Sequence, residues 1–218
     1  MVVKIALIHT VQSVLATFGN RIKDAIPNVK VVNTLDEFLA SDPAEKGEFT
    51  VNNMQRLFSI VKCAEMTEPD AIVVTCSTLS PIIEKISPFI KVPIITIDEG
   101  MIRKAVEIGS KITILATADS TVEPTKNKLI SEAQKISKDI NISVIVCPKA
   151  YVAIKAGDKQ YHDEIIKGSV LKIKQQDVVI LAQASMAHLE EDIQTICGCT
   201  VLSSPSMCIE QLKETLKK

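Results

Sequence analysis

The chain has 218 residues, of which 46% are hydrophobic and 23% are charged, so it is long enough and apolar enough to bury a globular core. Lysine and arginine (25) balance aspartate and glutamate (26), and only 3% of the residues are aromatic, which argues against binding to nucleic acids or to anionic membranes. No apolar run reaches the length of a membrane span and the N-terminus lacks a signal-peptide pattern, so the sequence predicts a cytoplasmic protein.

Short runs rich in isoleucine and valine alternate with amphipathic runs along the chain. The apolar runs predict buried parallel strands at Lys4–His9, Val29–Val32, Ala71–Thr75, Val92–Ile97, Ile112–Ala116, Ile142–Val146 and Val178–Ala182. The amphipathic runs predict helices, among them Asn53–Met66, Met101–Ile108 and Thr125–Ile136. This alternation predicts βαβ units and an α/β fold.

The two halves of the chain resemble each other in one register. The run KIALIHT from Lys4 aligns with KITILAT from Lys111, and DAIVVTC from Asp70 aligns with DVVILAQ from Asp177, so that the offset is 107 residues in both alignments. A repeat of this length fits two copies of one small domain. The sequence therefore predicts an internal duplication into two similar parallel-sheet αβα domains that face each other across a cleft. The first contains residues 1–96 and the second contains residues 97–205.

The residues that follow the predicted strands are the candidate site residues, because parallel sheets bind ligands beyond the carboxyl ends of their strands. These residues are His9, Thr10, Cys76, Ser77, Thr78, Thr117, Ser120, Thr121, Gln183, Ala184 and Ser185. Most of them carry a small hydroxyl group that could bind a substrate. Hydroxyl groups at these positions also cap helices, so the sequence leaves both interpretations open.

Cys76 is the candidate with the clearest chemistry. It ends a buried strand, and we expect a helix to follow with Ser80 as its N-cap and Pro81 at its first position. The positive end of a helix dipole stabilises a thiolate, which is the nucleophilic and basic form of cysteine. An inert buried cysteine is the alternative interpretation.

The remaining cysteines and histidines are given structural or surface roles. The six cysteines are expected to be free thiols in a chain of this size, and Cys197-Gly198-Cys199 lacks the second ligand pair of a zinc site, so no metal is predicted. Cys63 is expected in the core of a helix. His162 is expected to be solvated, and His188 is expected near the surface of the helix after Ser185.

Four segments resemble, in order, the motifs of the Asp/Glu/hydantoin racemase superfamily. They are the strand that runs into Cys76-Ser77-Thr78, the segment Val92–Glu99, the loop Thr117–Thr121 and the segment Leu181–Leu189. The resemblance spans nearly the whole chain. The superfamily contains racemases that use no cofactor, and relatives that isomerise maleate or decarboxylate arylmalonates.

The resemblance implies a mechanism in which one thiolate removes a proton from the α-carbon and a second thiol on the opposite wall of the cleft donates one. It implies that Cys76 is the first thiol, that the substrate is a small carboxylate or resembles an amino acid, and that the C-terminal helix Met207–Leu216 packs on the first domain. Residues 206–218 are assigned to the first domain, in addition to residues 1–96, on this resemblance. Family members are often dimers, and the resemblance is the only support for a homodimer here.

The chain departs from the family pattern at the second thiol position, which is occupied by Gln183. An amide cannot donate a proton as an acid near pH 7. His9, Cys147 or water could supply the second proton. The alternatives are a decarboxylase or cis–trans isomerase of the same superfamily that needs one thiol, and a non-catalytic protein that binds small carboxylates.

Overall fold

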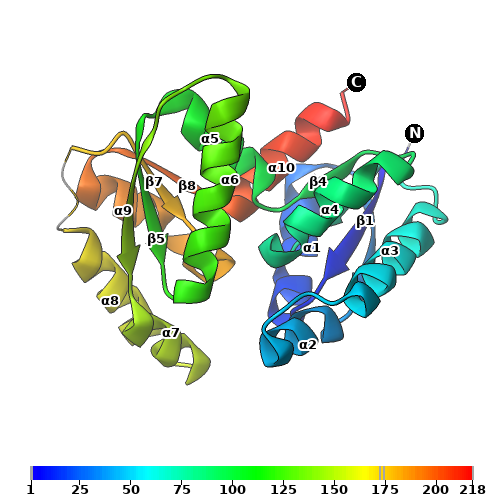
Figure 1. The fold of residues 1–218 in the computed structure, drawn as a ribbon, viewed down its shortest axis with the longest axis horizontal. Helices are drawn as coiled ribbons and strands as arrows, with labels where there is room; N and C mark the ends of the chain where they lie inside the picture. The colour runs from blue at the N-terminus through cyan, green and yellow to red at the C-terminus, as the bar shows by residue number, and fades with distance from the viewer. Residues whose placement is uncertain (1, 172, 174, 218) are drawn as a thin grey trace. The chain divides into compact units, whose positions relative to one another are not determined.

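The computed structural model describes residues 2–171, 173 and 175–217, which form two α/β units (Figure 1). The first unit contains Met1–Asp98 and Cys208–Lys218, and the second contains Glu99–Met207. Each boundary lies two residues after the boundary expected from the sequence. The end residues 1 and 218 of the first predicted domain lie outside the described residues.

Each unit contains a parallel four-stranded sheet, and the two sheets have the same strand topology, which confirms the predicted α/β class. The first sheet has the order β2-β1-β3-β4, with β1 (Lys4–His9), β2 (Lys30–Leu35), β3 (Ala71–Val74) and β4 (Ile94–Thr96). The second has the order β6-β5-β7-β8, with β5 (Lys111–Ala116), β6 (Asn141–Val146), β7 (Val178–Leu181) and β8 (Thr200–Ser203).

Helices cover both faces of the first sheet. They are α1 (Gln12–Ala25), α2 (Phe38–Lys46), α3 (Val51–Glu65) and α4 (Ser80–Ile86), with the 3-10 turns η1 (Ser77–Leu79) and η2 (Ser87–Phe89). Because successive strand residues point to opposite faces, Ile5 and Leu7 of β1 pack with α1, whereas Ala6 and Ile8 pack with α2, α3 and α4. The strands are thus buried on both sides, as their continuous apolar runs predict.

The second sheet is covered in the same way. Its helical elements are α5 (Glu99–Ile108), η3 (Asp119–Thr121), α6 (Val122–Lys135), α7 (Pro148–Lys155), α8 (Lys159–Val170), η4 (Ala184–Leu189) and α9 (Glu190–Cys197). Helices α5 and α6 pack on one face, and α7, α8 and α9 pack on the other (Figure 1). The last helix, α10 (Ser204–Thr215), begins in the second unit, and its Cys208 and Leu212 are fully buried in the core of the first.

The strand registers confirm the internal duplication. Ile5 of β1 pairs with Ala71 of β3, and the residues 107 positions later, Ile112 and Val178, pair in the same way. An aspartate anchors the amino end of each sheet. The Asp70 carboxylate accepts the Lys4 backbone N–H at 2.7 Å, and the Asp177 carboxylate accepts the Lys111 N–H at 2.8 Å.

Two expectations about burial are wrong. Cys63 is exposed, because α3 packs through Leu57, Val61 and Ala64, and a residue two positions after Val61 points about 200° away at 100° per residue. His162 is fully buried, because it lies one helical turn before Ile166 on the inner face of α8. The polar residues around His162 hide this periodicity.

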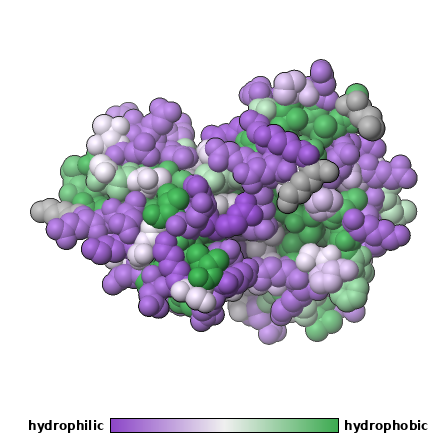
Figure 2. Space-filling model, turned by 90° about the horizontal axis from the view of Figure 1, so that it is seen from above, coloured by the Kyte–Doolittle hydropathy of each residue, from purple (hydrophilic) through white to green (hydrophobic). Residues whose placement is uncertain are grey.

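Within the described residues, no helix is both long and apolar enough to span a membrane. Hydrophilic residues cover most of the face seen in Figure 2, and the hydrophobic residues there lie in separate patches between them. The most exposed large apolar side chains, such as Met66 (79%) and Leu171 (69%), lie where a helix ends. Scattered apolar residues of this kind are ordinary for a globular surface.

Candidate active site

Cys76 lies directly beyond β3, at the carboxyl edge of the first sheet. Its side chain is half-buried, and its Sγ lies 3.0 Å from the Thr78 hydroxyl oxygen. The Cys76 carbonyl accepts the Leu79 N–H at 3.1 Å, which closes the turn η1 and keeps Ser77 and Thr78 beside the thiol. Cys76 is therefore a reachable thiol with a hydroxyl partner, an arrangement suited to proton transfer.

Ser80 does not cap the following helix as expected. The turn η1 runs directly into α4, which begins at Ser80 itself, with Pro81 in its first turn. The Ser80 hydroxyl donates instead to the Asp98 carboxylate at 2.8 Å, and both residues are buried. This bond links the start of α4 to the chain that follows β4, and it thereby holds the segment that follows Cys76 in place.

His9 is a fully buried residue that joins three strands. Its Nδ1 lies 2.8 Å from the Thr75 hydroxyl at the end of β3, and its Nε2 lies 3.0 Å from the Asn33 side-chain oxygen in β2. Burial lowers the pKa of His9, although the hydrogen bond with Asn33 opposes this shift. With both ring nitrogens engaged inside the unit, His9 is suited to positioning Thr75, the residue before Cys76, rather than to donating a proton.

Thr10 carries an unpaired hydroxyl. The residue is only 4% exposed, and among the described residues its Oγ1 has no hydrogen-bond partner. A buried hydroxyl without a partner costs free energy, so native proteins rarely contain one outside functional sites. Because Thr10 follows β1, the strand next to β3, this hydroxyl and the Cys76 thiol lie at the same edge of one sheet. A carboxylate oxygen of a ligand would satisfy it.

Gln183 occupies the position in the second unit that Cys76 occupies in the first. Its side-chain oxygen accepts the Thr117 backbone N–H at 2.9 Å, which links the ends of β7 and β5. Thr117 is almost fully buried and is the repeat equivalent of Thr10. The second thiol position is thus filled by an amide with a structural bond and no acidic proton.

The other candidates of the second unit differ in their exposure. The Thr121 hydroxyl donates to the Ala118 carbonyl at 2.8 Å, so it stabilises the turn η3, as the capping interpretation predicts. Ser120 and Ala184 are exposed, and Ser185 is half-buried. Cys147 is 6% exposed and packs in the core with residues of α7 and α8, which leaves its thiol little access to a substrate.

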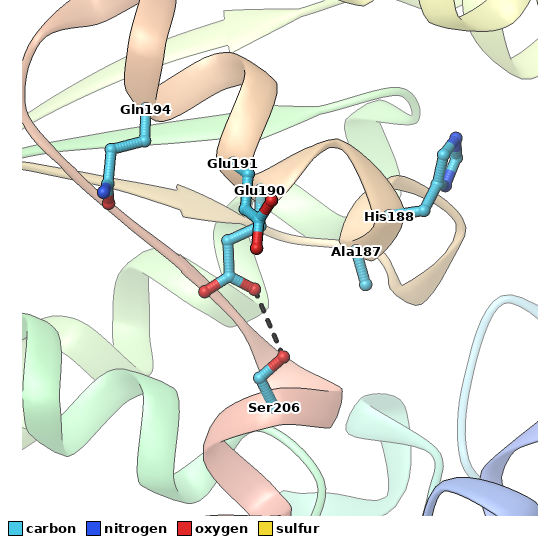
Figure 3. Close-up of a pocket in the computed structure, with 6 residues that line it drawn as sticks. All are labelled: Ala187, His188, Glu190, Glu191, Gln194 and Ser206. Carbon is cyan, nitrogen blue, oxygen red and sulfur yellow. Dashed lines mark hydrogen bonds between the residues drawn. The ribbon is translucent and has the colours of Figure 1, made fainter.

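A polar pocket of about 340 Å³ lies beside the carboxyl edge of the second sheet (Figure 3). The residues that line it are Ala187, His188, Glu190, Glu191, Gln194 and Ser206. Figure 3 shows Glu190 directed toward Ser206, whose hydroxyl lies 3.2 Å from the Glu190 carboxylate. The same carboxylate oxygen accepts the hydroxyl of Ser203, the last residue of β8, at 2.5 Å. Sequence analysis missed this pocket, and the only signal was the serine-rich segment after β8.

Asp163 holds two histidines near this pocket. Its two carboxylate oxygens lie 2.7 Å from His162 Nδ1 and 2.8 Å from His188 Nε2, and the two rings stack with their centroids 6.3 Å apart. Burial raises the pKa of Asp163, but the hydrogen bonds from the two histidines outweigh it and leave this pKa below the ordinary value. His188 lies on η4 and is oriented by this contact. In the part of the chain that is described, no three His, Cys, Asp or Glu residues are grouped to hold a metal ion.

Comparisons with known proteins agree with this fold. The model of the family Asp/Glu/Hydantoin racemase matches residues 5–212. None of the curated proteins matches the sequence.

Many solved structures are similar to this chain, and three examples each align with 99% of it. A glutamate racemase isoform from Bacillus anthracis has 18% identity over 82% of its own chain and a TM-score of 0.72. An allantoin racemase from Klebsiella pneumoniae has 13% identity, 88% coverage and a TM-score of 0.73. An aspartate racemase from Picrophilus torridus has 14% identity, 95% coverage and a TM-score of 0.69.

Proposed function

Because the chain belongs to the Asp/Glu/hydantoin racemase family, we propose that it is a cofactor-independent enzyme that uses the Cys76 thiolate to remove a proton next to a carboxylate or carbonyl group. The observation that carries this proposal is the half-buried Cys76 thiol beyond β3, beside the hydroxyl of Thr78. Family membership supports a racemase-like, isomerase-type enzyme.

The first step requires a base and a stabiliser of negative charge. When Cys76 takes the proton, the electron pair of the broken C–H bond moves into the adjacent carboxylate or carbonyl group, whose oxygens become more negative. Hydrogen-bond donors aimed at such oxygens lower the barrier. The buried Thr10 hydroxyl and the hydroxyl of Thr78 are donors at the same edge of the sheet as Cys76.

Gln183 determines how a proton can return to the α-carbon after Cys76 has removed one. A racemase must return a proton to the opposite face of the α-carbon, and the residue at the second thiol position has no proton to give near pH 7. If Cys76 is the only acid–base thiol, the proton returns mainly to the face it left. We therefore expect the protein to exchange the α-proton of one enantiomer with solvent faster than it racemises the substrate.

The bond between Gln183 and the Thr117 N–H also favours the second candidate function, a one-thiol decarboxylase or cis–trans isomerase of the same superfamily. Such a reaction needs one group to attack or protonate the substrate and does not need an acid on each face. The third candidate, a non-catalytic protein that binds small carboxylates, would use the same hydroxyl groups without turnover.

The test is α-proton exchange in D₂O measured by mass spectrometry, with chiral chromatography of the same samples. The panel contains both enantiomers of aspartate, glutamate and allantoin, together with hydantoins, arylmalonates and maleate. Cys76→Ala should abolish every reaction that the wild type catalyses. Cys63→Ala is the matched control, because Cys63 is an exposed thiol outside the site and its loss should leave the rates unchanged. Activity that survives Cys76→Ala would contradict the proposal.

A thermal-shift experiment with the same panel separates the binder from the enzyme. Ligands that bind the folded state raise the melting temperature in proportion to the logarithm of their concentration. Concentration-dependent stabilisation by a panel member, without exchange, racemisation, decarboxylation or isomerisation, would contradict the catalytic proposal and support the binder.

A further inference from the structure

Cys197 and Cys199 form a close pair of thiols outside the candidate active site. Their Sγ atoms lie 3.4 Å apart, which is within sulfur contact distance. Helix α9 ends at Cys197, and β8 begins at Thr200, so the pair occupies the turn between them. Gly198 adopts φ +67°, a left-handed conformation that favours glycine and that ends α9.

We propose that Cys197 and Cys199 are a redox modification site that forms a reversible intramolecular disulfide with a low-molecular-weight disulfide, such as oxidised glutathione, as the oxidant. The proposal stands on the placement of two free thiols in contact at an accessible turn. It does not depend on the racemase-like function.

The turn gives an oxidant access to the pair while holding the sulfurs together. Cys197 and Cys199 are half-buried, whereas the residues that alternate with them, Ile196, Gly198 and Thr200, are exposed. The inner side of the pair packs against the apolar core beneath α8 and α9. Because a disulfide needs its two Cβ atoms close together, a pair that is already in contact needs only a small local adjustment to close.

The raised pKa of Cys199 sets the order of the reaction. Burial, the hydrogen bond with Cys197, and the nearby charges of Cys197 and Asp177 raise the pKa of Cys199 to about 12. Cys199 therefore keeps its proton at neutral pH and can share it with the neighbouring sulfur. Because Cys199 keeps its proton, we assign the first attack to Cys197.

The exchange then follows two balanced steps. The Cys197 thiolate attacks one sulfur of oxidised glutathione, the glutathione S–S bond breaks, and one glutathione thiolate leaves. Cys199 loses its proton, and its sulfur attacks Cys197 Sγ and releases the second glutathione thiolate. Overall, two protein thiols are oxidised to a disulfide and one oxidised glutathione is reduced to two glutathione molecules.

The first step removes one obstacle to the second. Once Cys197 is a mixed disulfide, it is no longer an ionisable thiol beside Cys199. Two of the causes that raise the pKa of Cys199 are then absent, and mainly burial and Asp177 remain. Cys199 ionises more readily in the mixed disulfide than in the free pair, so the intermediate should be short-lived.

The cysteine pair and the polar pocket of the second unit lie at opposite ends of β8. Cys199 precedes the first residue of β8, whereas Ser203, which contacts Glu190 of the polar pocket, is the last. The strand separates the two ends by roughly three residue steps of about 3.3 Å each. Neither cysteine is a candidate site residue, so replacing them should leave the α-proton exchange rate of the reduced protein unchanged.

The experiment incubates the full chain in glutathione buffers of increasing oxidised fraction, followed by acid quenching and mass spectrometry. The wild type should lose the mass of two hydrogens, and peptide fragmentation should place the bond between Cys197 and Cys199 rather than at Cys208. Dithiothreitol should reverse the change. Cys199→Ser should accumulate one glutathione on Cys197, because the attacking sulfur of the second step is missing. Cys197→Ser should gain glutathione on Cys199 more slowly than Cys199→Ser gains it on Cys197, because burial and Asp177 still raise the pKa of Cys199.

The exposed Cys63 is the internal control, since it is a free thiol and is expected to form a mixed disulfide with glutathione. A wild-type chain that accumulates a stable mixed disulfide at Cys197, or that modifies neither cysteine in buffers that modify Cys63, would overturn the proposal. Equal modification of Cys199 in Cys197→Ser would overturn the assigned order of attack.

Discussion

Replacing Gln183 with cysteine tests whether the missing second thiol limits the chemistry. The structure gives two consequences with different readouts. The variant loses the 2.9 Å bond from the Thr117 N–H, and an unsatisfied buried N–H costs about 1–3 kcal/mol. At about 2–4 °C per kcal/mol for a chain of this size, the melting temperature should fall by about 2–12 °C. The variant also gains an ionisable thiol at the second family position.

The second readout is the ratio of racemisation to α-proton exchange. A correctly placed general acid is worth about 10²–10⁴ in rate, so Gln183→Cys should raise this ratio even where the geometry of the new thiol is imperfect. Gln183→Ser is the matched control. It also loses the side-chain oxygen that accepts the Thr117 N–H, and serine is similar in size to cysteine but has no acidic thiol. Both variants should lose similar stability, and only the cysteine should gain racemisation. Equal ratios in the two variants, or a wild type that racemises as fast as it exchanges, would refute the reasoning about Gln183.

Three further predictions concern the first unit. Cys76 should react with iodoacetamide faster than Cys63 at neutral pH although it is the less exposed thiol, and the reverse order in peptide mass spectrometry would count against an activated thiol. Thr10→Val should keep or raise the melting temperature, because it removes an unpaired buried hydroxyl, while it weakens the thermal shift produced by carboxylate ligands; unchanged ligand shifts would exclude a binding role. Below its unfolded pKa of about 6.5, His9 binds a proton more readily in the unfolded chain than in the fold, so stability should fall as the pH drops from 6.5 toward the folded pKa. Denaturant titrations at pH 7 and at pH 5.5 measure the free energy of unfolding, which should fall less between these pH values in His9→Gln than in the wild type. Equal losses in the two proteins would contradict a lowered pKa of His9.

The sequence predicted the fold because the fold depends on regular features. Strands buried on both faces must be continuously apolar, and a duplicated domain repeats its strands at a constant offset, so the KIALIHT and KITILAT runs identify β1 and β5 with the same register. Cys76 was found because it follows such a strand.

The details of the site depend on contacts between distant residues, which periodicity does not encode. His9 was expected to face a ligand, but Asn33 and Thr75 engage both of its ring nitrogens. Ser80 was expected to cap a helix, but Asp98 provides a better partner for its hydroxyl. That the carboxyl edges of the two sheets share one site remains a prediction from the sequence.

The path of α10 has a consequence for how this chain matures during synthesis. Cys208 and Leu212 are fully buried in the core that β1, β3 and α1 form at the beginning of the chain. That core therefore lacks two of its residues until the ribosome has synthesised the chain past residue 212. The second unit, whose residues are contiguous, can complete its own core earlier. The half that is translated first is thus expected to be the half that finishes folding last, and it would expose apolar surface to chaperones in the meantime.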